Sequence, residues 1–217
     1  MFSRQAPTDN SNKQIKFLLR QAMLPRIEPG VALDLFAGRG EIASRLYQPR
    51  SAGFREIHCV EKNPNSFAFL EKRFAGVENP QIHLHRGDNL KFISEKVAEI
   101  DGINLVDFDA YGSPNPQVKA FFRYYRASEP MLIFATDGGK LARLRGRLWH
   151  PDWYSAREPE GPPAPRYNHT VAQNYELLIR QFWRELSRVH AFSIQTFQLV
   201  WKRGKLVAYY GILLKPL

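Results

Sequence analysis

Three residues whose side chains could take part in a reaction follow one short apolar stretch of the chain. The segment 104–116 begins as an apolar strand and ends in a turn that presents Asp109, Tyr111 and Ser113. In an open parallel α/β sheet, ligands bind just beyond the carboxyl ends of the strands. A carboxylate there can accept the hydrogens of an amine, and an aromatic ring can stack on a base. The turn therefore predicts a site for a nucleobase amine. The alternative is an Asx-turn after a buried strand, with Tyr111 as packing.

Two earlier strand ends carry residues that suit an adenosine cofactor. Gly38 and Gly40 follow an apolar run, and Glu61 comes 21 residues after Gly40 at the end of the next strand. Glycine-rich strand-to-helix turns bind dinucleotides and other adenosine cofactors, and an acid at the next strand end accepts ribose hydroxyls. Asp88, after the third strand, is placed to meet an adenine amine. A nicotinamide cofactor fits the first two features equally well, but it has no need of the acidic and aromatic turn at 109–111.

Alternating strands and helices must position these residues. Short connections between them are typical of a doubly wound parallel sheet. The pattern predicts an α/β Rossmann-like fold in a single domain over 1–217, with an N-terminal extension and helix at 1–25 and a basic and aromatic insertion at 140–170. The expected strands are 31–37, 56–61, 81–84, 103–108, 130–137 and a terminal hairpin of 192–202 and 205–214, seven in all; the expected helices are 13–24, 42–47, 63–74, 90–99, 117–126 and 171–188.

Composition excludes several other classes of protein. A chain of 217 residues that is 44% hydrophobic and carries both charge signs is typical of a globular domain. Its one cysteine, Cys59, allows no disulfide framework and no cysteine-based zinc site, which favours a reducing compartment. His83 and His85 alternate along a strand, and we interpret them as solvent-side residues rather than metal ligands. Neither a signal peptide nor a membrane span is expected, so the predicted location is cytoplasmic.

The positive charge is concentrated near the C-terminus. The net charge is +10; residues 1–139 hold 18 basic and 16 acidic side chains, whereas 140–217 hold 13 and 5. Such a field attracts polyanions, so nucleic acid is the expected partner. Lys140, Arg143, Arg145 and Arg147 follow the fifth strand and are expected to contact phosphates, although such clusters are often only solvated. The aromatic residues of 149–168 suit either a stacking platform or a small local core.

Together these motifs resemble the class I S-adenosylmethionine-dependent methyltransferases, and more narrowly the tRNA guanine-N2 dimethyltransferase family. That family's fourth motif reads Asp-x-Asp-Pro-Tyr/Phe-Gly-Ser and its fifth strand ends in Ala/Thr-Thr-Asp, and this chain has D-F-D-A-Y-G-S at 107–113 and A-T-D at 135–137. Ala110 stands where the family has proline. The family's C-terminal tRNA-gripping domain has no counterpart in this sequence.

The resemblance implies an S-adenosylmethionine cofactor and a reaction at an exocyclic base amine, with guanine N2 in tRNA as the leading substrate. It leaves open a DNA or RNA adenine or cytosine amino-methyltransferase, and a non-catalytic subunit that binds the cofactor and docks RNA for a partner. No metal is expected, and a partner protein replacing the absent domain is conceivable. The implied catalytic residues are Asp109, Ala110 and Tyr111; the cofactor-binding residues are Asp34, Phe36, Gly38, Gly40, Glu61, Lys62, Asp88, Asn89 and Asp107; the substrate-binding residues are Ser113, Asp137, Lys140, Arg143, Arg145 and Arg147.

Overall fold

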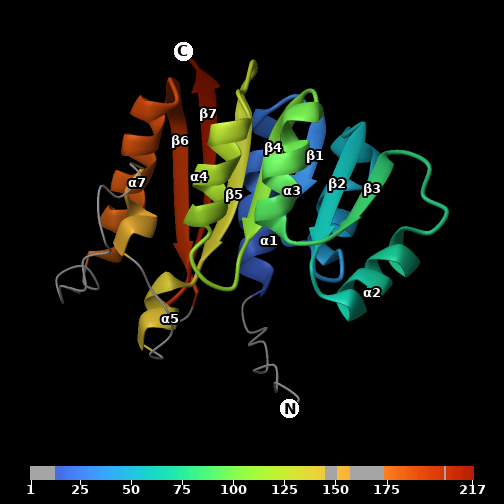
Figure 1. The fold of residues 1–217 in the computed structure, drawn as a ribbon, viewed down its shortest axis with the longest axis horizontal. Coiled ribbons are helices and arrows are strands. Elements are labelled where there is room, and N and C mark those ends of the chain that lie inside the picture. Colours follow the sequence, from blue (N-terminus) through green and yellow to red (C-terminus); the bar gives the residue numbers. More distant parts are fainter. Residues whose placement is uncertain (1–12, 145–150, 157–173, 203) are drawn as a thin grey trace.

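A computed structural model describes residues 13–144, 151–156, 174–202 and 204–217. Strands and helices alternate along most of this range (Figure 1). The strands are β1 (Val31–Asp34), β2 (Glu56–Glu61), β3 (Gln81–Arg86), β4 (Ile103–Asp109), β5 (Met131–Asp137), β6 (Phe192–Trp201) and β7 (Ala208–Pro216). The α-helices are α1 (Lys13–Met23), α2 (Pro64–Phe74), α3 (Asn89–Lys96), α4 (Asn115–Tyr124), α5 (Gly139–Leu144) and α7 (Tyr175–Val189). Shorter helical turns are η1 (Leu24–Arg26), η2 (Ala43–Tyr47), η3 (Arg50–Ala52), η4 (Val97–Glu99) and η5 (Pro151–Tyr154).

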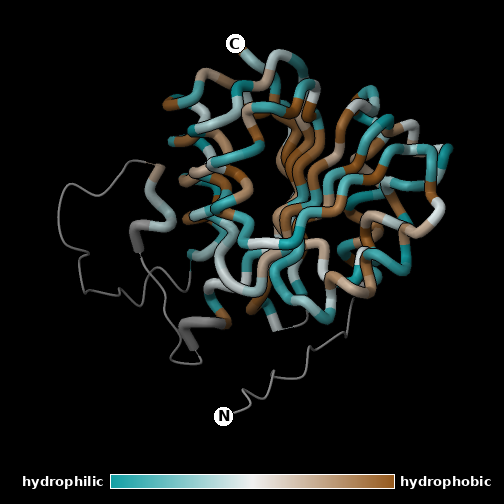
Figure 2. The backbone as a smooth tube through the Cα atoms, turned by 45° about the vertical axis from the view of Figure 1, so that its right-hand side comes forward, coloured by the Kyte–Doolittle hydropathy of each residue, from teal (hydrophilic) through white to brown (hydrophobic). Residues whose placement is uncertain are grey.

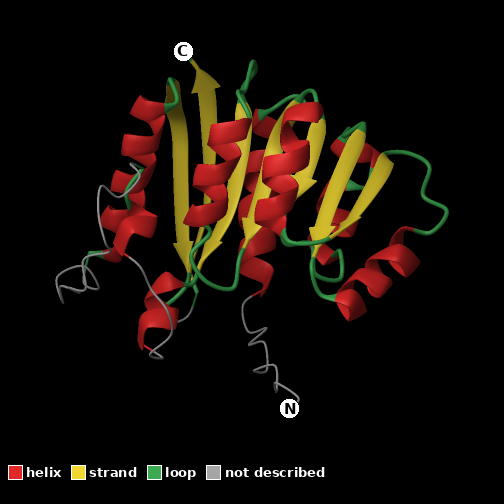
Figure 3. Ribbon diagram, in the orientation of Figure 1, coloured by secondary structure: helices red, strands yellow, loops and turns green. Residues whose placement is uncertain are grey.

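The described strands form one seven-stranded sheet in the order β3-β2-β1-β4-β5-β7-β6. The first five are parallel, and β7 runs antiparallel between β5 and β6. The chain order reverses between β1 and β4, and in open α/β sheets the ligand site lies at such a switch point. The carboxyl ends of β1 to β5 share the lower edge of the sheet in Figures 1 and 3.

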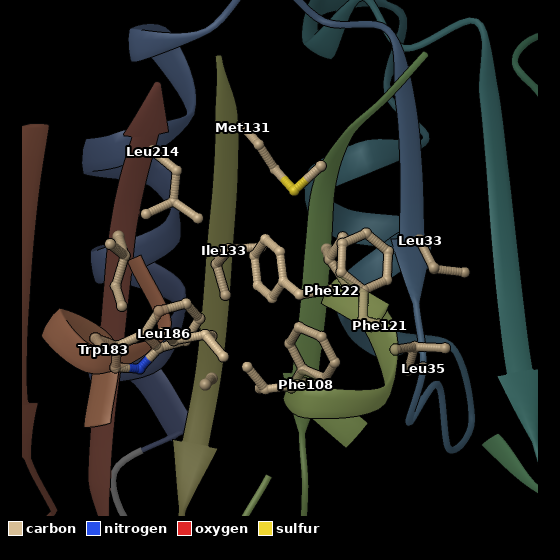
Figure 4. Close-up of a cluster of buried hydrophobic side chains, with 14 of the residues drawn as sticks. Leu33, Leu35, Phe108, Phe121, Phe122, Met131, Ile133, Trp183, Leu186 and Leu214 are labelled. Carbon is tan, nitrogen blue, oxygen red and sulfur yellow. The ribbon is translucent and has the colours of Figure 1, made fainter. Parts of the chain in front are cut away.

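Each face of the sheet has its own hydrophobic core. The most hydrophobic residues lie along the central strands (Figure 2). On one face α3, α4 and α7 supply Phe121, Phe122, Trp183 and other buried residues against β4, β5 and β7 (Figure 4). On the other face the buried Met23 of α1 joins residues from η2 and α2. Burial on both faces explains why β1, β4 and β5 read as continuous apolar runs rather than alternating ones. Among the described residues, no helix is long and apolar enough to cross a membrane.

The structure confirms the predicted fold class and corrects several boundaries. β1 stops at Asp34 because the Asp34 carboxylate accepts the Phe36 amide and turns the chain. The second hairpin strand is 208–216 rather than 205–214. The short helix after β1 is a π-helical turn, and 151–154 within the expected irregular segment is helical.

The expected positions of two histidines also need correction. His83 and His85 are partly buried rather than simply facing solvent. Both rings stack on His58 of β2, with centroids 4.4 and 5.3 Å from its ring.

Candidate functional site

The turn after β1 has the backbone conformation that its glycines predict. Gly38 and Gly40 have φ of +56° and +73°, in the left-handed region that favours glycine. A Cβ on Gly40 would also lie 2.7 Å from Leu70 and 2.9 Å from Phe74 of α2. Gly40 therefore serves both the turn and the close approach of α2.

Glu61 closes this turn from the end of β2. Its carboxylate accepts the Gly38 amide at 2.8 Å and the Asn63 amide at 2.6 Å. The two hydrogen bonds hold the Glu61 carboxylate against the glycine turn, next to the switch point of the sheet. The structure thus brings together Gly38, Gly40 and Glu61, as the sequence predicts.

Asp88 and Lys62 form an exposed pair one strand further along. Lys62 Nζ lies 3.0 Å from Asp88 Oδ2, and the other oxygen of Asp88 accepts the Leu90 amide at the start of α3. The hydrogen bond from Lys62 is the main cause that lowers the pKa of Asp88 below its usual value. Asn89 lies beside them and contacts the Leu35 carbonyl and Gln117.

Two of the expected cofactor residues are more buried than their sequence positions suggest. Asp34 is 1% exposed, and burial, followed by the charges of Asp107 and Asp109, raises its pKa well above the usual value. Phe36 is partly buried and packs against the core under α3.

Asp107, predicted as a cofactor ligand, is instead part of a buried structural network. Arg20 of α1 donates to both of its oxygens at 2.7 Å, and Tyr47 donates at 2.6 Å. Arg20 is 1% exposed and Asp107 0%. Burial alone would lower the pKa of Arg20, but Asp107 outweighs it and raises that pKa. Because its acceptors are taken and it is out of reach of solvent, Asp107 anchors α1 to β4.

Asp109 ends β4 and keeps a partly accessible carboxylate. Lys16 of α1 donates to Oδ2, and the Thr136 hydroxyl of β5 donates to Oδ1. Burial would raise the pKa of Asp109, but the charges of Lys16 and Arg20 outweigh it and hold that pKa below its usual value. Asp109 is therefore an ionised acceptor at neutral pH. Nothing in the sequence motifs pointed to Lys16, since it lies 93 residues away from Asp109.

The rest of the predicted turn divides into an exposed ring and buried neighbours. Tyr111 is 85% exposed, which does not fit a packing role. Ala110 is 6% exposed and donates its amide to the Phe108 carbonyl. Ser113 is buried as well, and its hydroxyl accepts the Asn115 amide at the start of α4. Ser113 thus shapes the turn, whereas Tyr111 faces outward.

Asp137, expected among the substrate-binding residues, is buried and caps the glycine turn that follows β5. It is 0% exposed; its carboxylate accepts the Gly139 amide at 2.9 Å and the hydroxyls of Tyr154 and Tyr175 at 2.7–3.0 Å. A Cβ on Gly139 would collide with both hydroxyls. Burial raises the pKa of Asp137 to about 6, although these hydrogen bonds oppose the shift. Tyr154 is also 4% exposed and belongs to the same core as Phe122 and Trp183, so the described part of the aromatic segment packs into the core on that face of the sheet.

A basic hollow lies beside the start of α5. It has a volume of about 390 Å³, and its lining includes Lys140, Trp201 and Lys205, together with Arg180, which is paired with Glu176 at 2.8 Å. The ammonium of Lys140 lies 5.9 Å from the centroid of the Trp201 ring. Arg143 belongs to α5, whereas Arg145 and Arg147 lie outside the described residues. Of the expected phosphate contacts, Lys140 is thus the one whose surroundings are described.

Comparison with known proteins identifies the fold. No family model matches this chain, and no curated protein sequence matches it. Among solved structures, a putative methyltransferase, yhhF from Escherichia coli, is 16% identical with a TM-score of 0.55, covering 99% of this chain and 93% of that one.

Two proteins from Pyrococcus horikoshii are similar to the same extent. Trm1, solved with S-adenosyl-L-methionine, is 14% identical with a TM-score of 0.59. The match covers 94% of this chain and 55% of the Trm1 chain. A putative RNA methyltransferase is 17% identical with a TM-score of 0.52. That match covers 94% of this chain and 85% of the other. These neighbours and the strand order give the chain the Rossmann-like fold of class I methyltransferases.

Proposed function

We propose that this chain is an S-adenosylmethionine-dependent N-methyltransferase that acts on an exocyclic base amine in RNA, with guanine N2 in tRNA as the leading substrate. One observation carries the proposal. At the switch point of a methyltransferase fold, the ionised carboxylate of Asp109 lies two residues from an exposed aromatic ring, Tyr111. An amine acceptor and a stacking surface are the two features that a base amine requires.

The residues at the neighbouring strand ends fit the cofactor. Glu61 is held at the glycine turn, where its oxygens can meet ribose hydroxyls, and the half-exposed Asp88 can meet the adenine amine. The surface along this edge is open, since a Cβ on Gly87 or Gly112 would have no neighbour within 4 Å. When bound, the cofactor would supply an electrophilic methyl group on a sulfonium ion. A row of acids at the edge suits that positive charge.

The chemistry that falls to Asp109 follows from the weakness of the nucleophile. The lone pair of an exocyclic amine is delocalised into the base ring, so the amine attacks poorly. Acceptors on its hydrogens, here the Asp109 carboxylate and the Ala110 carbonyl, turn the lone pair out of the ring plane and disperse the developing positive charge. On taking up the methyl group, the nitrogen would release a proton to Asp109 or to water.

Tyr111 and the basic hollow would bring the base to that carboxylate. A base amine inside a duplex cannot reach the partly buried Asp109 carboxylate, so the target base must leave its stack. An exposed tyrosine can stack on the extruded base, and stacking is worth about 1–3 kcal/mol per base. Lys140 lies three residues beyond the end of β5 and could contact a phosphate. One structural neighbour is described as a putative RNA methyltransferase, and this description supports an RNA substrate.

The test supplies the purified chain with methyl-labelled S-adenosylmethionine and, separately, total tRNA, rRNA and DNA. Chromatography of the digested product identifies the labelled nucleoside. Label in N2-methylguanosine from tRNA supports the leading substrate, and label in an adenosine or cytidine amine moves the substrate but keeps the mechanism. Label on a ring nitrogen or a ribose would contradict the role assigned to Asp109.

A second candidate, a non-catalytic cofactor-binding subunit, is favoured by one observation. Both carboxylate oxygens of Asp109 already accept a hydrogen bond, from Lys16 and Thr136. Each carboxylate oxygen has room for a further donor, so a substrate amine can still bind. Measurable cofactor binding without label transfer to any nucleic acid would favour the subunit over the enzyme.

A further inference from the structure

A cluster of three histidines and one glutamate lies on the β2–β3 edge of the sheet and has no part in the proposed reaction. Glu56 and His58 are two residues apart on β2, so they share one face of the sheet. His83 of β3 is directly opposite His58 in the strand register, and His85 lies two residues further along. Four side chains from two neighbouring strands thus meet on one face.

The distances within this histidine cluster suit a metal ion. Glu56 Oε2 lies 3.6 Å from Nε2 of His58 and 3.6 Å from Nε2 of His83. One ligand atom from each of the three residues lies within 4.8 Å of the others. Zinc bonds of about 2.0–2.2 Å place tetrahedral ligands roughly 3.4 Å apart, so small side-chain rotations would close the site.

Two nitrogens in the cluster lack a partner where one is expected. Among the described residues, Nε2 of His58 and Nε2 of His83 are buried and without a hydrogen bond. The His58 residue is only 6% exposed, so water does not readily replace the missing partner. Buried polar atoms are nearly always hydrogen-bonded. Two buried nitrogens without a hydrogen bond, each 3.6 Å from the same carboxylate oxygen, are therefore arranged in a way that suits a cation.

His85 is placed to orient His58 for such a role. Its Nε2 lies 3.1 Å from Nδ1 of His58. If Nδ1 of His58 carries the proton and donates it to His85, the lone pair of His58 is on Nε2, which lies near Glu56. Histidine ligands in metal sites commonly donate their other ring N–H to such a partner.

We propose that Glu56, His58 and His83 bind a divalent transition metal of the zinc class, with His85 as a positioning residue and a fourth coordination position open to solvent. Imidazole and carboxylate ligands suit zinc or nickel better than magnesium or calcium. Glu56 lies five residues and His58 three residues before Glu61, which ends β2, so the site lies roughly 10–16 Å from the cofactor edge. The metal would fasten the edge strand β3 to β2 rather than take part in methyl transfer.

The test titrates Zn²⁺ into the full chain after chelator treatment, with calorimetry for affinity and Co²⁺ absorption for tetrahedral geometry. We expect one ion per chain and a raised melting temperature. The variants His83→Ala and Glu56→Gln should weaken Zn²⁺ binding by roughly 100-fold and 10-fold, and His85→Ala by about 10- to 100-fold. His190→Gln, a histidine outside the cluster, is the matched control and should bind as the parent does.

Two outcomes would overturn the proposal. One is a parent chain that binds no stoichiometric Zn²⁺; the other is a His83→Ala variant that binds it as tightly as the parent, which would place the ion elsewhere. Glu56→Gln keeps shape and hydrogen bonding at a partly exposed position, so it reports on the site even if a histidine variant fails to fold. Unchanged methyl transfer in these variants would agree with a structural ion.

Discussion

The aspartates that end β4 and β5 are neighbours in the sheet but have opposite electrostatic environments. Asp109 is paired with the Lys16 ammonium, and its pKa lies below the usual value. Asp137 is enclosed by Tyr154 and Tyr175, neutral donors that only partly offset its burial, so its pKa rises to about 6. The Lys16 cation keeps Asp109 ionised well below neutral pH, whereas Asp137 becomes ionised only as the pH rises through about 6.

The difference shows that the role of a strand-end acid is decided by elements remote in sequence. α1 supplies the cation to Asp109, and η5 and α7 supply the hydroxyls to Asp137. The two sites are also linked directly, because the Gly138 amide donates to the Gly112 carbonyl at 2.8 Å. We therefore assign substrate chemistry to Asp109 and support of the adjoining turn to Asp137.

The sharpest way to break this assignment is to remove one charge at a time. Asp109→Asn should lower the methyl-transfer rate by about 10²- to 10⁴-fold, the range for a positioned acid–base group, while cofactor affinity stays within a few-fold. Asp137→Asn should retain most of the rate because it keeps an acceptor for the Gly139 amide. Rates under single-turnover conditions decide the matter. Equal losses in the two variants would contradict the division of roles.

A second prediction concerns Arg20, which is paired with Asp107 of β4; among the described residues, no arginine is paired with Asp137 in the same way. Arg20→Met removes the guanidinium that donates to both oxygens of the buried Asp107. Removing one partner of a buried ion pair lowers the free energy of unfolding by about 3–5 kcal/mol. Urea unfolding should show this loss in the free energy of unfolding. Arg50→Met, at an exposed arginine, is the control and should change stability by less than about 0.5 kcal/mol. A loss under about 1 kcal/mol for Arg20→Met would mean that Asp107 is not held as described.

Much of this arrangement was predictable from local sequence patterns. Apolar runs that end in Gly38, Glu61, Asp88 and Asp109 predicted the parallel strands and the edge where their ends meet. Such features are local, because a buried strand and its turn are specified by adjacent residues. Asn63, for example, caps α2 by accepting the amides of Asn65 and Ser66.

What the sequence could not predict was which partners reach each acid. Asp107 and Asp109 are alternate residues of one motif, yet one is enclosed by Arg20 and the other remains partly accessible. The difference depends on how α1 packs across the sheet, a contact between residues about 90 positions apart. The histidine cluster was missed for a similar reason, because His58 and His83 meet only through the β2–β3 register.

The two acids should also respond to pH in opposite directions. A shift in the pKa of Asp137 from 3.8 to about 6 corresponds to about 3 kcal/mol. The folded state then binds a proton more tightly than the unfolded state, so this contribution is present below pH 4 and is lost as pH rises toward 6. For Asp109 the lowered pKa stabilises the fold above pH 4, and that stability is lost as pH falls.

Unfolding measured from pH 4 to 7 tests the Asp137 part of this prediction. The stability of Asp137→Asn relative to the parent should rise over that range, because the variant buries no charge at high pH. Parallel curves for variant and parent would show that Asp137 keeps an ordinary pKa. Asp109→Asn should not share this trend.

The smallest effect on function is expected from substitutions in the basic hollow beside the start of α5. Lys140 lines the hollow with Arg180 and Trp201, so Lys140→Gln should remove about one phosphate contact. RNA affinity should fall modestly, and the slope of log affinity against log salt should become less steep by about 1. Lys215→Gln, an exposed lysine near the end of β7, should leave the slope unchanged, since that end of the sheet lies opposite the proposed site. Equal slopes of log affinity against log salt for the two variants would mean that RNA does not contact the hollow. Tyr111 would then be the proposed RNA contact nearest to Asp109.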